Sequence, residues 1–193
     1  MLTSARGFTL PEVLLAMAAG SLIILAAAKA YPALRQQSAA FLGAYQLELR
    51  LRQAAFGIEK DLRRAGFCAG TCIGRAMSIA RHAGEAPDSC VIVAYDLNRN
   101  GRWEATGDEA EKFGYRLREG RLERQRGVSQ CNGGGWENLF ERAEVHIETF
   151  NVRLLPGKDG RRLLRLTLGG RSADSGAMTR SMRWDINVEV PSA

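Results

Sequence analysis

The sequence predicts an α+β protein in which one long N-terminal helix carries antiparallel β-structure against its C-terminal half. Two patterns lead to this expectation: an apolar stretch followed by a helical stripe early in the chain, and short runs of strand-forming residues after residue 90. The chain has 193 residues, of which 25% are charged, and a formal net charge of +6. This composition excludes collagen-like, low-complexity and generally disordered chains.

Residues 8–28 form an almost uncharged apolar stretch, which as a helix spans roughly 31 Å, about the hydrocarbon thickness of a bilayer. Arg6 and the initiator amine precede it, and by the positive-inside tendency they stay in the cytoplasm while the rest of the chain crosses the membrane. We therefore expect a leader peptide at residues 1–7 and the membrane-spanning half of the helix at 8–28. Residues 29–193 are expected to form a globular periplasmic domain that includes the second half of the helix.

A secretory signal peptide is the competing interpretation of this stretch. Residues 28–30, Ala-Lys-Ala, have the small side chains of a signal peptidase site, and Tyr31 would be the new terminus. Against this interpretation, Pro11 and Glu12 stand where the apolar region of a signal peptide begins, and the helical pattern continues past residue 29. The sequence therefore favours a retained anchor.

Glu12 is the acidic residue inside this stretch. A carboxylate in a membrane-spanning helix costs on the order of 2 to 3 kcal/mol at the centre and less near an end, so its presence suggests a partner. If the chain were cut after Gly7, the new amine of Phe8 would lie one helical turn from Glu12. The two groups could then pair, within one chain or between neighbouring chains.

Residues 7–12, Gly-Phe-Thr-Leu-Pro-Glu, resemble the N-terminus of the type IV prepilins, together with the basic leader before them and the apolar run after them. The resemblance implies that a prepilin peptidase cuts after Gly7, that Phe8 becomes the N-methylated terminus, and that Glu12 guides subunits into the filament. Pro11 replaces the aliphatic residue that is commoner in the family. A first helical turn tolerates proline, because its N–H groups have no helical partner.

The resemblance also implies the pilin fold. Residues 61–66, Asp-Leu-Arg-Arg-Ala-Gly, resemble the helix end of the larger minor pilins of the PilW and GspJ type, and the whole chain is similar to the group of prepilin peptidase-dependent protein B. The implied function is that of a minor pilin of the bacterial inner membrane, later of the pilus fibre or tip. It would help start or cap a type IV pilus together with other minor pilins, the major pilin and the assembly platform. The alternatives are a type II secretion pseudopilin and a DNA-binding pilus-tip module.

Past residue 29 the helix is expected to continue to about Ala65, with Pro32 bending it and Gly66 as its C-terminal cap. Its domain half shows apolar residues at steps of three or four, the stripe of an amphipathic helix. These residues are Leu47, Leu51, Ala54, Ile58, Leu62 and Ala65.

Strand signals occupy the second half of the chain. The expected strands are residues 90–97, 113–117, 122–126, 143–155, 162–168 and 182–190. Glu119-Gly120 is expected to turn a hairpin, and residues 169–180, rich in glycine and serine, to form a long polar loop. From Trp184 to Val190 every second residue is apolar, which predicts antiparallel sheet with its buried side on the helix.

The four cysteines are an even number in a domain expected outside the cytoplasm, which favours disulfides over free thiols. Three pairings are open on the sequence alone, and we expect Cys68–Cys72 and Cys90–Cys131. A zinc site needs two closely spaced ligand pairs, whereas 40 residues separate the second pair of cysteines here.

Residues 96–104 match the first half of a calcium loop, with oxygen ligands at alternate positions and then a glycine. Calcium is therefore the one candidate cofactor. Gly107 stands at the twelfth position, where a bidentate glutamate is wanted, so the sequence favours a plain Asn100-Gly101 turn without a cofactor, and weak calcium binding is the alternative. The candidate ligands are Asp96, Asn98, Asn100, the carbonyl of Arg102, Glu104 and Asp108.

The sequence contains no enzyme constellation. His82 and His146 lack metal-ligand or triad spacing to a nucleophile, and the glycines at 133–135 lack the lysine and following helix of a phosphate loop. Basic residues are spread over the helix, the hairpin and the loops, with few aromatic residues among them. We therefore expect a solvated basic surface and neither catalysis nor nucleic-acid binding.

Overall fold

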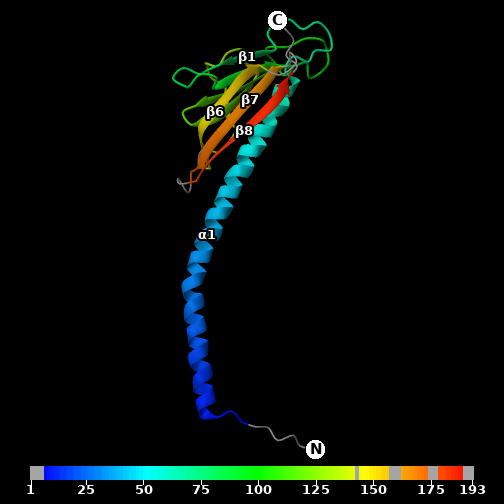
Figure 1. Ribbon diagram of the computed structural model, residues 1–193. Helices are drawn as coiled ribbons and strands as arrows, with labels where there is room; N and C mark the ends of the chain where they lie inside the picture. The colour runs from blue at the N-terminus through cyan, green and yellow to red at the C-terminus, as the bar shows by residue number, and fades with distance from the viewer. Residues whose placement is uncertain (1–6, 142–143, 157–161, 174–177, 189–193) are drawn as a thin grey trace, which may run out of the picture. The chain divides into compact units, whose positions relative to one another are not determined.

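The computed structural model describes residues 7–141, 144–156, 162–173 and 178–188. Within these ranges the chain forms one α-helix and eight β-strands (Figure 1). The elements are α1 (Leu10–Arg64), β1 (Met77–Ala80), β2 (Cys90–Ala94), β3 (Lys112–Arg118), β4 (Arg121–Arg126), β5 (Glu137–Asn138), β6 (Val145–Pro156), β7 (Arg162–Ser172) and β8 (Thr179–Val188). The chain divides into two compact units, residues 1–42 and residues 43–193.

The first unit contains the N-terminal part of α1. The helix continues through Pro32, because proline removes one backbone hydrogen bond while the turns on either side keep theirs. Apart from Gly20, every residue from 7 to 42 is exposed. The helix is long and apolar enough to cross a membrane, which agrees with the predicted anchor.

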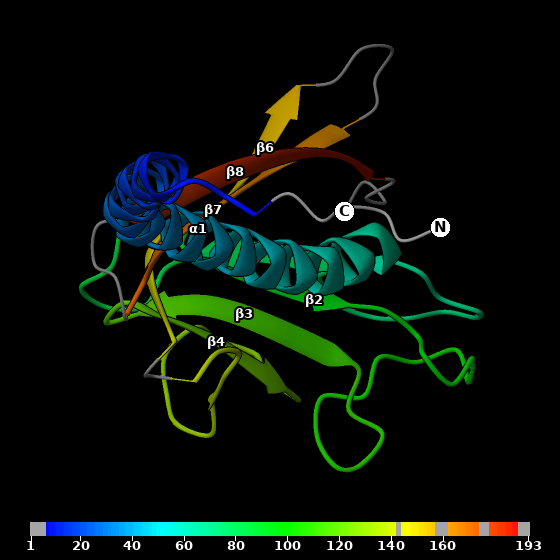
Figure 2. The ribbon, with the colours of Figure 1, turned by 90° about the horizontal axis from the view of Figure 1, so that it is seen from below.

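The second unit contains two antiparallel sheets. Strands β1 to β5 pair in chain order as one sheet, and β6, β7 and β8 form the other. Side chains of α1 and of both sheets share one apolar core. Figure 2 shows the domain part of α1 between β8 and β3. The predicted α+β class, with antiparallel structure packed on the second half of the helix, is confirmed.

The predicted apolar stripe of α1 faces this core. All six of its residues, from Leu47 to Ala65, are at most 7% exposed. Residues three and four positions apart lie on one side of a helix, so local spacing was sufficient to identify them. Asp61 is buried on the same face, and the stripe did not predict it.

Gly66 ends α1 as expected. Its φ of 90° lies in the left-handed region, which glycine adopts without a steric penalty. Its N–H then donates to the carbonyl oxygen of Ala94 at 2.9 Å, so the end of the helix is fixed to the end of β2.

The predicted hairpin is formed by β3 and β4. Arg118 pairs with Arg121, which leaves Glu119 and Gly120 as a two-residue turn. Both turn residues have positive φ, 49° and 74°, as a type I′ turn requires. The turn prediction is therefore confirmed.

The prediction of a long loop at residues 169–180 is wrong at both ends. β7 continues to Ser172 and β8 begins at Thr179, with Gly169 opposite Ser181 in the register. A Cβ on Gly170 would lie 2.8 Å from the carbonyl oxygen of His146, and one on Gly169 would lie 3.1 Å from Ser181. The two glycines therefore serve close strand packing.

Other strand boundaries also differ from the prediction. The strand predicted at 90–97 ends at Ala94, because the next backbone groups leave the ladder: the N–H of Asp96 donates to Phe67. The short strands β1 and β5 were not predicted. Residue 143 and residues 189–190, which the predicted strands included, lie outside the described residues.

Asp61 forms a buried polar cluster with two tyrosines. The hydroxyl of Tyr95 donates to Asp61 Oδ1 at 3.1 Å, and the hydroxyl of Tyr115 donates to Oδ2 at 2.6 Å. Burial, reinforced by the negative charge of Asp61, raises the pKa of Tyr95 to about 12 and also raises the pKa of Tyr115.

The folded chain is therefore expected to lose stability above pH 10. Between about pH 10 and 12 the unfolded tyrosines release protons while the folded ones retain them, so the free energy of unfolding falls as pH rises, by at most about 1.4 kcal/mol per pH unit for each tyrosine. Urea unfolding of the chain in detergent at pH 9, 10 and 11 measures this slope. Tyr95→Phe should make the slope shallower, and an unchanged slope would contradict the assignment.

Candidate functional site

The start of α1 combines the predicted cleavage junction with a helix cap. Gly7 and Phe8 precede the helix, and the side chain of Phe8 is 83% exposed. A peptidase can reach such a junction, because its backbone is not held in helical hydrogen bonds. Residues 1–6 of the predicted leader lie outside the described residues.

Glu12 is the third helical residue and points back to Thr9. The backbone N–H and the hydroxyl of Thr9 donate to Glu12 Oε2 in long hydrogen bonds of 3.5 and 3.4 Å. The carbonyl oxygen of Thr9 in turn accepts from the N–H groups of Glu12 and Val13. The bond from the Thr9 N–H to the Glu12 carboxylate is one half of a capping box, and its Thr-x-x-Glu pattern is visible in the sequence.

A second apolar stripe of α1 is exposed along the helix, and we call it the outer stripe. Its members recur at steps of seven, four, four and seven residues, which keeps them on one side of a helix, and they are between 43% and 73% exposed. The outer stripe consists of Leu34, Phe41, Tyr45, Leu49 and Phe56.

The outer stripe reaches into the globular domain. Leu49 stands two positions from Leu47 and from Leu51, both of which are buried, and two positions is about half a turn of helix. Phe56 is 72% exposed although it belongs to the same helix segment as the core residues. The domain half of α1 is thus apolar on two faces, and within the part of the chain that the structure describes only one of them is covered.

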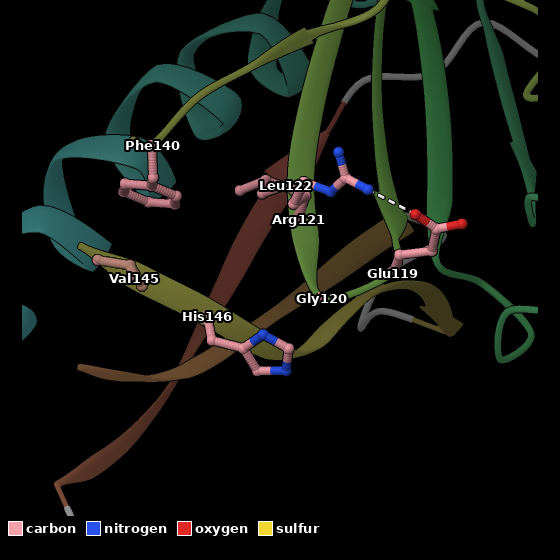
Figure 3. A pocket seen from close by; sticks show the side chains of 7 residues that line it. All are labelled: Glu119, Gly120, Arg121, Leu122, Phe140, Val145 and His146. Atoms are coloured by element: carbon pink, nitrogen blue, oxygen red, sulfur yellow. Dashed lines mark hydrogen bonds and ion pairs between the residues drawn. The ribbon is translucent and has the colours of Figure 1, made fainter. Parts of the chain in front are cut away.

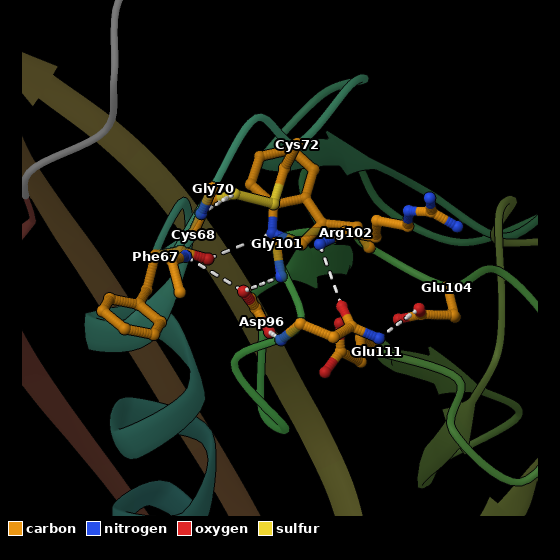
Figure 4. The surroundings of a disulfide bond; sticks show 12 residues. Phe67, Cys68, Gly70, Cys72, Asp96, Gly101, Arg102, Glu104 and Glu111 are labelled. Atoms are coloured by element: carbon orange, nitrogen blue, oxygen red, sulfur yellow. Dashed lines mark hydrogen bonds between the residues drawn. A yellow bond between two sulfur atoms is a disulfide. The ribbon is translucent and has the colours of Figure 1, made fainter.

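The cysteines form the two expected disulfides, Cys68–Cys72 after the helix and Cys90–Cys131 in the domain. Cys90 and Cys131 belong to a second, smaller apolar cluster. The sulfur atoms of the first disulfide lie near the carboxylate of Asp96, as Figure 4 shows. Because both sulfurs are bonded to each other, they offer no thiolate to a metal.

The loop after β2 brings several predicted calcium ligands together. Asp96 Oδ2 accepts from the N–H groups of Ala69 and Gly101, both at 2.9 Å, and Oδ1 accepts from Asn100 at 3.0 Å. Burial raises the pKa of Asp96, but these backbone donors outweigh it and hold that pKa below its usual value. The side-chain oxygens of Asn98 and Asn100 accept from N–H groups two residues further on.

Glu104 joins this network, whereas Asp108 is exposed. Asn100 Nδ2 donates to Glu104 Oε1 at 2.7 Å, and this bond lowers the pKa of Glu104. The prediction missed Glu111, whose side chain is 1% exposed and accepts from the N–H groups of Leu97 and Asn98. Burial raises the pKa of Glu111. No local pattern could have indicated Glu111, because it reaches the loop only when β3 lies beside β2.

His146 borders a pocket of about 260 Å³ where the β3–β4 turn meets β6 (Figure 3). Its imidazole lies so close to Gly120 that a Cβ at position 120 would come within 2.0 Å of it. Glu119 and Arg121 form an ion pair at the same turn. The imidazole of His146 therefore packs β6 against the turn of the hairpin.

Comparisons with known proteins agree with these features. The prokaryotic N-terminal methylation motif matches residues 2–28, and the family of prepilin peptidase-dependent protein B matches residues 41–188. Prepilin peptidase-dependent protein B of Escherichia coli (strain K12) is 38% identical over 148 residues, which cover 76% of each chain. No solved structure matches the chain. A methylation motif at the exposed start of α1, followed by a match across the whole described domain, shows that the chain belongs to the family of prepilin peptidase-dependent protein B.

Proposed function

We propose that the protein is a minor pilin, which helps start or cap a type IV pilus together with other minor pilins, the major pilin and the assembly platform. In this proposal a prepilin peptidase cuts after Gly7, Phe8 is methylated, and the helix holds the chain in the inner membrane with its domain in the periplasm. The outer stripe of α1 is the observation that carries the proposal.

A membrane anchor by itself needs apolar side chains only within the bilayer. The outer stripe continues to Phe56, far beyond the 21 residues that span the hydrocarbon, and it leaves large apolar side chains in water. Burial of such surface is favourable by about 25 cal/mol for each square ångström that is removed from water. Helices of neighbouring subunits packed alongside α1 would bury it, and side-by-side packing of helices is what a pilus fibre provides.

Glu12 supports the same proposal. Its two hydrogen bonds to Thr9 are long, at 3.5 and 3.4 Å, so the carboxylate is weakly held by its own chain. Cleavage after Gly7 would create a positive amine at Phe8. The amine of one subunit could then pair with the carboxylate of its neighbour. This pair would neutralise two charges in an apolar environment and align one subunit against the next.

The double variant Tyr45→Ser/Phe56→Ser tests the proposal. Both side chains are exposed, at 58% and 72%, so the free energy of unfolding should change by no more than about 0.5 kcal/mol per substitution. Incorporation into pili, measured by immunoblotting of sheared fibres, should be lost because the helix can no longer pack against its neighbours. The matched control Gln53→Ser/Lys60→Ser changes two exposed polar residues of the same helix and should leave incorporation intact.

Intact mass spectrometry accompanies this experiment and should give an N-methylated Phe8 terminus for every variant. A terminus at Tyr31 would show a secreted protein without an anchor and would contradict the proposal. Normal incorporation of the Tyr45→Ser/Phe56→Ser variant would show that the outer stripe is not needed for pilus assembly.

A pseudopilin of a type II secretion system would use the same outer stripe, and deletion of the gene separates the two functions. Loss of surface pili with normal protein secretion supports the minor pilin. Loss of secretion with normal piliation supports the pseudopilin.

Ion pairs argue against a DNA-binding tip. Arginines on the helix and on the sheet pair with acidic side chains, as Arg50 does with Glu144 and Arg165 with Asp185. Paired arginines neutralise phosphates less well than a free basic stripe does.

A further inference from the structure

The buried carboxylate of Glu111 uses only one of its two oxygens. Oε1 accepts from the backbone N–H groups of Leu97 and Asn98, the latter at 3.1 Å. Oε2 is buried and has no hydrogen-bond partner, and the side chain as a whole is 1% exposed. A buried polar atom without a partner costs about 1 to 3 kcal/mol and therefore calls for an explanation.

Glu104 also has a buried carboxylate oxygen without a hydrogen-bond partner. Its Oε1 accepts from Asn100, whereas its Oε2 is buried without a partner. The backbone N–H of Glu111 donates to the carbonyl oxygen of Glu104 at 2.8 Å, which holds the two residues side by side. Figure 4 shows both side chains beside the loop of Asp96.

Two ionised carboxylates this close repel each other unless a positive charge lies between them. Among the residues that the structure describes, no lysine or arginine forms an ion pair with Asp96, Glu104 or Glu111. The loop therefore concentrates negative charge and two unused oxygens at one buried point.

We propose that Glu104 Oε2 and Glu111 Oε2 together bind a calcium ion, at the base of the loop that begins with Asp96. Carboxylate oxygens are hard ligands, which suit calcium, whereas zinc prefers the thiolates and imidazoles that are missing from this loop. The backbone bonds that Asp96, Asn98 and Asn100 accept give the loop its shape, and water completes the coordination. Glu111 thus supplies a carboxylate that the spacing of residues 96–108 lacks.

Calcium binding is expected to stabilise the full chain. With few protein carboxylates, the dissociation constant should lie in the range of about 0.1 to 1 mM. In about 10 mM calcium, compared with EDTA, the melting temperature of the detergent-solubilised protein should rise by about 5 °C. Terbium, a luminescent substitute for calcium, should show emission sensitised by Trp103, which is the neighbour of Glu104 in sequence.

Conservative amide variants identify the ligands. Glu111→Gln and Glu104→Gln should each abolish the calcium-dependent rise in melting temperature and the terbium emission. Glu109→Gln removes the same charge from an exposed residue of the same loop and should retain both responses. Because Glu104 is only half-buried, its variant tests the proposal even if Glu111→Gln does not fold.

Two results would overturn the proposal. If calcium leaves the melting temperature of the unaltered protein unchanged and terbium emission is absent, the two carboxyl groups share a proton instead of a metal ion. If the calcium response persists in both amide variants, the ion binds elsewhere.

Discussion

Replacing Glu123 by alanine is expected to lower the free energy of unfolding by about 3 to 5 kcal/mol, because it leaves a buried guanidinium without its counter-charge. Arg116 is fully buried, and its Nε donates to Glu123 Oε2 at 2.7 Å. Its Nη1 donates to the carbonyl oxygens of Cys131 at 2.7 Å and of Gly133 at 3.2 Å. The guanidinium also lies 4.2 Å from the centre of the Trp136 ring. Arg116 therefore joins β3, β4 and the loop that follows.

Urea unfolding of the full chain in detergent, followed by tryptophan fluorescence, measures this loss. Glu119→Ala is the matched control, because it removes the same side chain from an ion pair with Arg121 in which Glu119 is 65% exposed. Such an exposed pair contributes less than about 1 kcal/mol. If the two variants lost equal stability, the buried pair would have no special role.

Replacing Cys90 and Cys131 together by alanine is expected to cost about 4 kcal/mol. Their disulfide joins residues 41 positions apart, so in the chain-entropy model it removes much of the conformational freedom of the unfolded chain. Cys90 and Cys131 also lie in the smaller apolar cluster with Ile92 and Val128, so the variant additionally loses the buried contacts of both sulfur atoms. Denaturant unfolding under non-reducing conditions gives the value.

The other disulfide supplies the comparison for this prediction. Cys68 and Cys72 are only four positions apart, so the same model gives about 2 kcal/mol for their joint replacement by alanine. If the Cys90/Cys131 variant lost less free energy of unfolding than the Cys68/Cys72 variant, the disulfide that closes the longer loop would not be the more stabilising one.

Local patterns predicted much of the fold. The apolar stripe of α1, the cap at Gly66 and the turn at Glu119-Gly120 each depend on residues within a few positions of one another, and the structure confirms them. The same holds for β8, where the apolar residues Trp184, Ile186 and Val188 alternate with exposed ones. In these elements side-chain periodicity and backbone preference already determine the conformation.

Elements whose form depends on distant neighbours were predicted poorly. Gly169 and Gly170 were assigned to a loop from their composition, whereas in the sheet they allow close approach by Ser181 and by the backbone of His146. Strands β1 and β5 are too short to show a pattern of their own, and they form because β2 and β4 offer edges with which to pair. No window of sequence contains that information.

The candidate sites divide in the same way. The sequence alone determined the N-terminal motif from Gly7 to Glu12, the apolar stretch after it and the even number of cysteines, because each is a property of neighbouring residues or of composition. Only the tertiary structure decided that Arg116 and Asp61 are buried and that Glu111 lies beside Glu104. The charged side chains of Arg116 and Asp61 are buried where partners from other elements satisfy them, and the packing of the helix and the two sheets brings those partners together.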